Sequence, residues 1–335
     1  MTRPLLIIFL TIFVNLIGFG IIIPLLPYYA EQFGASPLVI GLLFAARIVD
    51  GLSGGNITTA RAYIADISTE ENRARAFGVL GAGFGLGFII GPALGAAFSH
   101  ISMTAPIWAA AAITVVATVL AWVWLPETVH HVRATAGSPW KAIRELGGRP
   151  SLRLLFTVDF VYWTAFAVYQ TTFALFGARR FGFDAAHTGY LLSAFGFLGV
   201  LVQGVLVAHV VKALGAKTTL ALGLVCAAIG WGGSALTYSL PVFVAMLVPG
   251  ALGIGLCNAT LSTLISNAAD PREQGRVQGA AGALESLGRT IGPVWGNGAL
   301  QLFGEGKAYG SAAVVLLGAA ALTLRYEPPP PRPRG

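Results

Sequence analysis

Charge and cysteine are both scarce in this sequence of 335 residues. Only 10% of the residues are charged, whereas a soluble domain carries about 25% because its surface must face water. Hydrophobic residues make up 56% of the chain, and its mean hydropathy is +0.75. This composition excludes a water-exposed surface over most of the chain and predicts a protein whose solvent is the lipid bilayer.

The two cysteines, Cys226 and Cys257, lie inside apolar stretches, so neither a disulfide framework nor a cysteine metal site is expected. The adjacent His130 and His131 have no further candidate ligands around them, and we expect both to be solvated. The sequence therefore predicts no metal and no bound cofactor.

Long apolar runs recur along the chain. A helix needs about 20 apolar residues to cross a bilayer core about 30 Å thick. The runs are continuous rather than alternating, so they predict helices and an all-α, polytopic membrane protein. Ten spans are expected: Leu5–Leu26, Leu38–Ala65, Phe77–Phe98, Ile107–Leu125, Leu154–Phe176, Gly189–Val211, Thr218–Leu236, Val242–Ile265, Gly279–Leu302 and Tyr309–Leu324.

The basic residues predict the orientation of these spans. If the chain starts in the cytoplasm and alternates sides, fifteen Lys and Arg residues fall in cytoplasmic segments and three in outer loops. Cytoplasmic loops of membrane proteins are enriched in Lys and Arg. We therefore expect a multi-pass protein of the inner (plasma) membrane with both termini in the cytoplasm. The formal net charge of +7 orients the chain, and no nucleic-acid partner is expected.

The longest polar stretch between spans follows the fourth span and predicts two bundles. An N-terminal bundle of four spans covers 1–128, a cytoplasmic linker 129–153, and a C-terminal bundle of six spans 154–325. A long loop is the alternative interpretation of 129–153. The proline-rich end, 326–335, is expected to be a disordered cytoplasmic tail.

An internal repeat supports two bundles. When Gly78–Gly95 is aligned with Gly279–Gly296 at a constant offset of 201, nine of eighteen residues are identical. Both copies contain Gly-x-x-x-Gly-Pro. Paired repeats of this kind are typical of transporters that build two bundles around a midplane site.

Several motifs resemble those of the major facilitator superfamily. Gly87–Gly95 resembles the antiporter motif of the family's fifth helix, and Arg47–Asn56 resembles the arginine motif of its fourth. Leu125–Thr128 is similar to the end of the sixth helix. The same set of motifs resembles those of the drug:proton antiporter branch, which includes the tetracycline exporters. The resemblance implies a major facilitator fold, a small-molecule substrate, protons as coupling ions and a proton gradient as the energy source.

The chain departs from that family pattern at one place. Leu38–Ala45 resembles the start of the family's second helix, yet the sequence from Ala46 onward resembles its fourth. Most of helix two, all of helix three and the outer end of helix four are therefore expected to be absent. Both helices run inward, so every later span keeps its orientation.

Arg47 and Asp50 are the first candidates for proton coupling. They are three residues apart in an expected span and share a helix face with Arg61. An ionisable group inside a span costs about 3 kcal/mol, so each is a functional candidate, although a static ion pair is the alternative. Asn56 in the same span and Asn15 in the first span are candidate cavity residues. The tetracycline exporters that the chain resembles carry an acid at the position of Asn15.

Two further groups of candidates lie in the C-terminal bundle. Asp159 shares one helix face with aromatic and amide side chains, which suits an apolar or cationic substrate, although aromatic packing is the alternative. The other members of this face are Tyr162, Trp163 and Gln170.

Glu285 and Arg289 replace Phe84 and Phe88 of the first copy at the 201-residue offset. Because they are four residues apart, they are expected to pair across one helical turn, in a cavity or gate or as a structural pair. Asn258 is a weaker cavity candidate.

The repeated glycines and prolines predict either a gating hinge or tight static packing. The gating residues expected are Gly87, Gly91, Pro92, Gly95, Gly292 and Pro293.

Together these patterns predict a monomeric transporter that exports amphipathic small molecules or drugs by proton-coupled alternating access. No catalytic constellation is present, and no enzymatic activity is expected. The alternative is a membrane protein that lost transport with the missing helix pair, either a remnant or a ligand-binding protein.

Overall fold

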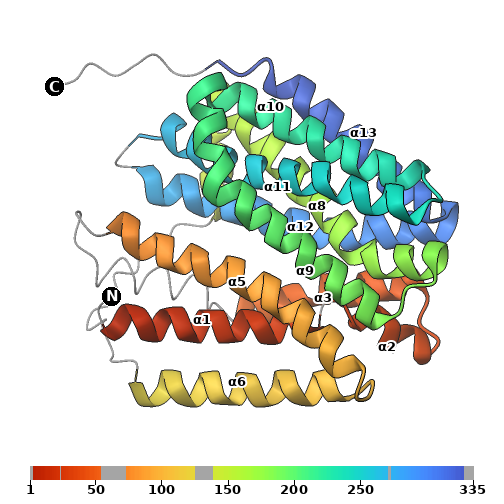
Figure 1. Cartoon of the computed structure of the whole chain (residues 1–335). Coiled ribbons are helices and arrows are strands. Elements are labelled where there is room, and N and C mark those ends of the chain that lie inside the picture. The colour runs from red at the N-terminus through yellow and green to blue at the C-terminus, as the bar shows by residue number, and fades with distance from the viewer. Residues whose placement is uncertain (1–2, 23, 54–72, 125–138, 271–272, 328–335) are drawn as a thin grey trace. The chain divides into compact units, whose positions relative to one another are not determined.

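The structure, a computed structural model, describes residues 3–22, 24–53, 73–124, 139–270 and 273–327. Regular structure within those ranges is helical, without a strand (Figure 1). The elements are α1 (Arg3–Ile22), α2 (Leu26–Gln32), α3 (Pro37–Ser53), α5 (Arg73–Ser99), α6 (Ala105–Trp124), α7 (Pro139–Leu146), α8 (Pro150–Phe181), α9 (Ala185–Leu201), the π-helical turn η1 (Val202–Leu206), α10 (Val207–Leu236), α11 (Leu240–Ala268), α12 (Gln274–Phe303) and α13 (Glu305–Thr323). The prediction of an all-α protein is confirmed.

All ten apolar segments overlap helices of the structure. Five helical stretches among the described residues are long and apolar enough to cross a membrane: Ala105–Trp124, Pro150–Phe181, Ala185–Leu236, Leu240–Ala268 and Glu305–Thr323. The third of these has 52 residues, which is more than a single crossing needs.

Gly215 divides that long stretch. Its backbone has φ 78° and ψ 159°, a conformation that glycine adopts without the penalty that other residues incur. The break separates the predicted spans Gly189–Val211 and Thr218–Leu236, so the length of this stretch agrees with two predicted spans.

The chain divides into two compact units. The first unit comprises Met1–Ala35, Arg47–Ala134 and Phe173–Phe197, and the second comprises Ser36–Ala46, Thr135–Thr172 and Leu198–Gly335. Each unit therefore combines segments that are far apart in the sequence. The sequence boundaries near residues 128, 153 and 325 stay predictions.

The core of the first unit forms where α1 lies against α5 and α6 (Figure 1). Ile17, Ile21 and Leu25 are buried at this contact. Tyr28 of α2 joins the segment that begins α9, because its hydroxyl lies 2.6 Å from the Thr188 hydroxyl. The apolar contacts position α1 against the glycine-rich face of α5.

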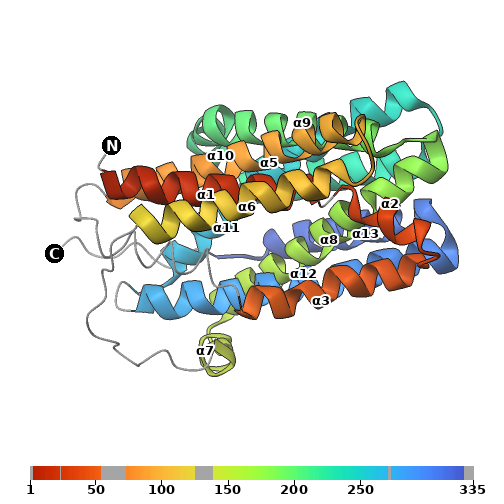
Figure 2. The same ribbon diagram turned by 90° about the horizontal axis from the view of Figure 1, so that it is seen from below.

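The second unit has an aromatic core. Tyr169 of α8 stacks on Trp231 of α10, with ring centroids 5.1 Å apart, and lies 5.2 Å from the ring of Tyr309 on α13. These three large side chains are almost fully buried. Large aromatic side chains contribute strongly to core packing, so this cluster fixes α8 relative to α10 and α13. Within this unit, Figure 2 shows α12 alongside the part of α3 that ends at residue 46.

Candidate functional site

Four side chains of the second unit form the acid–arginine cluster: Asp159 and Trp163 of α8, and Glu285 and Arg289 of α12. Arg289 Nη2 lies 2.8 Å from Glu285 Oε1, as their four-residue spacing predicted. The Arg289 guanidinium carbon lies 4.1 Å from the centre of the Trp163 ring. One arginine therefore joins an acid on its own helix to an aromatic ring on another helix.

Asp159 is the enclosed acid of the cluster. Asp159 is only 5% exposed, and Trp163 lies one turn after it on the same helix. The charged groups that face it are Glu285 and Arg289 of α12. A buried carboxylate is costly unless a cation lies near it, and Arg289 is the cation of this cluster.

The Glu285–Arg289 pair is more open than Asp159. The side chains of Glu285 and Arg289 are 34% and 41% exposed, respectively. A cationic group that approaches this pair meets the Glu285 carboxylate, and the face of the Trp163 ring lies under the guanidinium; carboxylates and ring faces are groups that bind organic cations. A cationic ligand can therefore take the place of the Arg289 guanidinium.

Neighbouring aromatic side chains support Trp163. The Trp163 ring lies 5.2 Å from Tyr162 and 5.6 Å from Phe166, in edge-to-face geometry with both. Tyr162 is fully buried, and its hydroxyl donates a 3.5 Å hydrogen bond to the Ile254 carbonyl of α11. Packing on both sides holds the indole ring where Arg289 covers it.

Two predicted cavity residues of the second unit lie away from the cluster. Gln170 is almost two turns beyond Trp163 on α8, and no hydrogen bond in the described part of the chain joins it to the cluster. Asn258 of α11 accepts a hydrogen bond from Ser262 at its backbone carbonyl. Their roles in a cavity stay predictions.

The N-terminal candidates cannot be placed in this way. α1 and α3 include the backbone of Asn15, Arg47 and Asp50, but the side chains of these residues lie outside the described part. Asn56 and Arg61 lie wholly outside the described residues. The coupling role of the Arg47–Asp50 pair therefore stays a prediction.

The repeated glycine motif packs helices closely in both units. A Cβ added at Gly91 of α5 would lie 2.7 Å from the Gly20 Cα of α1, and one added at Gly292 of α12 would lie 2.5 Å from the Thr164 carbonyl oxygen of α8. Contacts this short leave no space for a side chain. Gly87 and Gly95 meet α1 in the same way.

The two motif prolines face glycines that the sequence analysis did not single out. A Cβ at Gly189 of α9 would lie 2.6 Å from the Pro92 carbonyl oxygen, and a Cβ at Gly41 of α3 would lie 2.6 Å from that of Pro293. Each glycine is the fifth residue of its helix. A glycine near the start of both helices was the feature of the sequence that could have pointed to these contacts.

Asn297 is a second residue that the sequence analysis missed. It is fully buried one turn after Pro293, and its Nδ2 donates a hydrogen bond to the Pro293 carbonyl oxygen at 2.9 Å. The corresponding residue of α5 is Ala96. The signal in the sequence was an asparagine at a position where the first copy of the repeat has alanine.

A polar network joins the start of α12 to the segment around α7. Arg149 Nη1 lies 2.6 Å from Glu273 Oε2, and Arg276 pairs with Glu145 of α7. The hydrogen bond with Glu273 raises the pKa of Arg149. Among the described residues, no group of three or more His, Cys, Asp and Glu side chains is placed to hold a metal ion.

Comparison with known proteins identifies the class to which this fold and its repeated motif belong. The model of the Major Facilitator Superfamily matches residues 42–293 and 204–335. The chain therefore belongs to the major facilitator superfamily and is a multi-pass membrane protein.

Two curated relatives and one solved structure add detail. The chain is 33% identical to the class G tetracycline resistance protein of Vibrio anguillarum over 78% of this chain and 67% of the relative. It is 32% identical to the class C tetracycline resistance protein of Escherichia coli over 78% of this chain and 66% of the relative. The matches thus span about two thirds of these relatives.

The crystal structure of the human organic anion transporter MFSD10 (TETRAN) shares the fold. Its TM-score is 0.70 at 20% identity, over 96% of this chain and 99% of that chain.

Proposed function

We propose that this chain exports amphipathic small molecules in exchange for protons, by alternating access. The observation that carries the proposal is the acid–arginine cluster, in which a partly exposed arginine pairs with Glu285 and covers a tryptophan ring beside the buried Asp159. The similarity to tetracycline resistance proteins supports export as the direction of transport. An amphipathic molecule fits because the cluster combines charge with aromatic side chains, of which Phe166 is partly exposed beside Trp163.

The substrate competes with Arg289 within the cluster. Glu285 holds Arg289 over the Trp163 ring, and a cationic group of the substrate replaces the guanidinium on that ring. The buried Asp159 attracts the incoming cation from the enclosed side.

The Arg47–Asp50 pair supplies the coupling to the proton gradient. Asp50 carries the proton and Arg47 sets its proton affinity, because a neighbouring cation favours the ionised form of an acid. The two bundles change the side to which the site opens. The glycine–proline contacts of α5 and α12 act as the pivots, since backbones in contact can turn without side chains interfering.

The alternative is a membrane protein that binds ligand without carrying it across. It is favoured by the matches to only about two thirds of the resistance proteins. It also agrees with the predicted absence of a helix pair from the N-terminal bundle. For either function, we propose that both termini lie in the cytoplasm and that the protein is a monomer.

Drug accumulation in an efflux-deficient bacterial host separates these two functions. Cells expressing the chain receive a panel of fluorescent cationic, zwitterionic and anionic compounds, with and without collapse of the proton gradient. The control is the same chain with a relative's helix pair restored.

We expect the chain itself to lower the accumulation of cationic or zwitterionic compounds only while the gradient is present. If only the restored chain does so, this chain does not transport and is either a remnant or a ligand-binding protein.

A further inference from the structure

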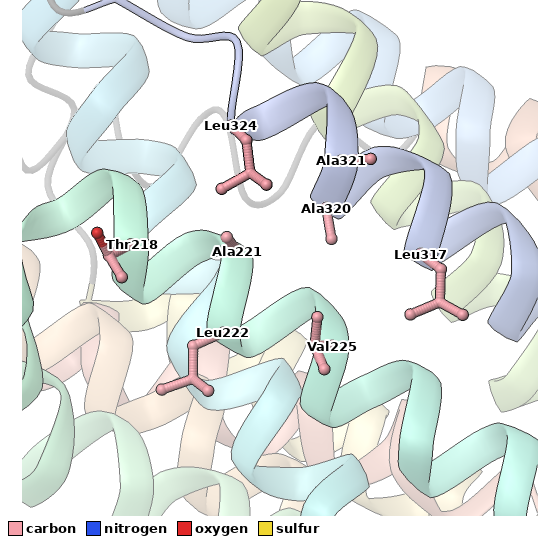
Figure 3. A pocket seen from close by; sticks show the side chains of 8 residues that line it. All are labelled: Thr218, Ala221, Leu222, Val225, Leu317, Ala320, Ala321 and Leu324. Carbon is pink, nitrogen blue, oxygen red and sulfur yellow. The ribbon is translucent and has the colours of Figure 1, made fainter.

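A groove of about 430 Å³ runs between α10 and α13 in the second unit (Figure 3). Its lining is apolar except for one hydroxyl group, that of Thr218. Residues of α10 form one side and residues of α13 the other. The lining residues are Thr218, Ala221, Leu222, Val225, Leu317, Ala320, Ala321 and Leu324.

Small residues form the floor of the groove and leucines form its walls. Ala221 and Ala320 are 9% and 6% exposed, whereas Leu222, Leu317 and Leu324 are 40%, 49% and 63% exposed. Leu324 lies seven positions after Leu317, which gives the groove a length of about 10 Å at about 1.5 Å per residue. An apolar channel of this shape suits one extended hydrocarbon chain.

Positive charge gathers at one end of the groove only. Thr218 and Leu324 lie at the same end in Figure 3, and their chain neighbours are Lys217 and Arg325. Neither side chain has a carboxylate partner within ion-pair distance among the described residues. Thr218 itself is exposed. The opposite end, at Val225 and Leu317, carries no charged lining residue.

We propose that this groove binds an anionic phospholipid of the membrane. One acyl chain lies in the groove, and the phosphate lies between Lys217 and Arg325, where the Thr218 hydroxyl donates a hydrogen bond to it. Charge complementarity selects the anionic headgroup, because each Lys or Arg near a membrane surface contributes to the attraction of anionic lipid. With the proposed orientation, the headgroup belongs to the cytoplasmic leaflet, which is where anionic lipid would find these cations.

The site lies apart from the acid–arginine cluster, which is formed by α8 and α12. Its occupant therefore does not compete with the transported substrate. The lipid instead fills the space between α10 and α13 that protein side chains leave open. This inference does not depend on the proposed transport activity, since binding is measured without it.

Native mass spectrometry of the purified full chain tests the proposal. The protein is exchanged against phosphatidylglycerol or phosphatidylcholine with identical acyl chains. We expect one phosphatidylglycerol to bind more tightly than phosphatidylcholine. Lys217→Gln with Arg325→Gln should weaken phosphatidylglycerol binding about 10- to 30-fold, as expected for two interfacial cations, and leave phosphatidylcholine binding unchanged.

Matched variants and a soluble competitor complete the test. Arg144→Gln with Arg153→Gln removes the same charge elsewhere and should leave binding intact. Ala321→Trp fills the groove from an exposed position and should weaken the binding of both lipids. Thermal unfolding of each variant confirms that it is folded, and Lys217→Arg should retain binding.

Equal loss in the two double variants would show general attraction of anionic lipid to basic residues, which overturns the proposal. Displacement of the lipid by glycerol phosphate at equal concentration would also overturn it, because the acyl chain would then contribute nothing. Unchanged phosphatidylglycerol binding by Lys217→Gln with Arg325→Gln is the third contrary result.

Discussion

Helix α5 of the first unit and helix α12 of the second carry the same Gly-x-x-x-Gly-Pro sequence and pack in the same manner. The second glycine of each motif meets a neighbouring backbone, and each motif proline turns its carbonyl toward a glycine of another helix. The helices differ one turn before that glycine. There α5 has Phe88, whereas α12 has Arg289, which is paired with Glu285.

This difference separates architecture from chemistry. The shared glycines and prolines build the same helix contact twice, so they explain the fold of both units. The charges occur in one copy only, and charge within a span is costly. We therefore infer that the second unit carries the substrate chemistry, and that α5 shows what α12 would be without it.

The largest effect is expected when α12 is made to resemble α5. Glu285→Phe with Arg289→Phe removes both charges and leaves the glycine contacts intact. Efflux should fall at least 10-fold, because no group would exchange with the substrate's cation, a loss of about 1.4 kcal/mol or more. Drug accumulation in the efflux-deficient host measures this change.

The matched control is made in α5. Phe84→Leu with Phe88→Leu alters the corresponding positions without touching charge, and efflux should stay within about twofold of the unaltered chain. An equal loss in both double variants would show that these positions matter for packing alone.

A smaller effect is expected at the shared glycines. Gly292→Ala places a Cβ 2.5 Å from the Thr164 carbonyl oxygen and should lower the free energy of unfolding by about 1–3 kcal/mol. Gly282→Ala, on the same helix, meets nothing within 4 Å and should not lower it, because alanine favours a helix over glycine by about 0.5–1 kcal/mol. Thermal unfolding in detergent compares the two. Equal stability would contradict the packing role.

The smallest effect concerns an acid outside the spans. Asp184 precedes α9 in the first unit and accepts a hydrogen bond from the backbone N–H of His187 at 2.8 Å. Partial desolvation raises the pKa of Asp184, but its hydrogen bonds with the backbone and ring of His187 outweigh this, so the pKa is lowered. Asp184→Ala should cost about 1 kcal/mol of stability near neutral pH.

The sign of its pH dependence follows from the lowered pKa. The ionised carboxylate stabilises the folded chain above its ordinary pKa of about 4, and that contribution is lost as the pH falls through the lowered value. The difference in unfolding temperature between Asp184→Ala and the unaltered chain should therefore shrink at acid pH. Asp184→Asn, which keeps an oxygen for the backbone contact, should lose less. A difference that grows at acid pH would contradict this account.

Local pattern was enough to predict the helices and one part of the site. Apolar runs of span length fix the helices, and the spacing of Glu285 and Arg289 fixes their pair within one helix. The contact of Arg289 with Trp163 joins helices that are far apart in the sequence, so spacing alone does not reveal it. The glycine partners of Pro92 and Pro293 were not predicted for the same reason.

Substrate-driven proton flux tests proton-coupled export most directly. The purified chain is reconstituted in liposomes that contain a pH-sensitive dye, and a cationic drug is added without an imposed pH gradient. The account predicts that the drug moves protons in the opposite direction, and that Asp50→Asn abolishes this flux. Flux that persists in Asp50→Asn would contradict the coupling role of Asp50, and the absence of any drug-driven flux in the unaltered chain would contradict the proposed exchange itself.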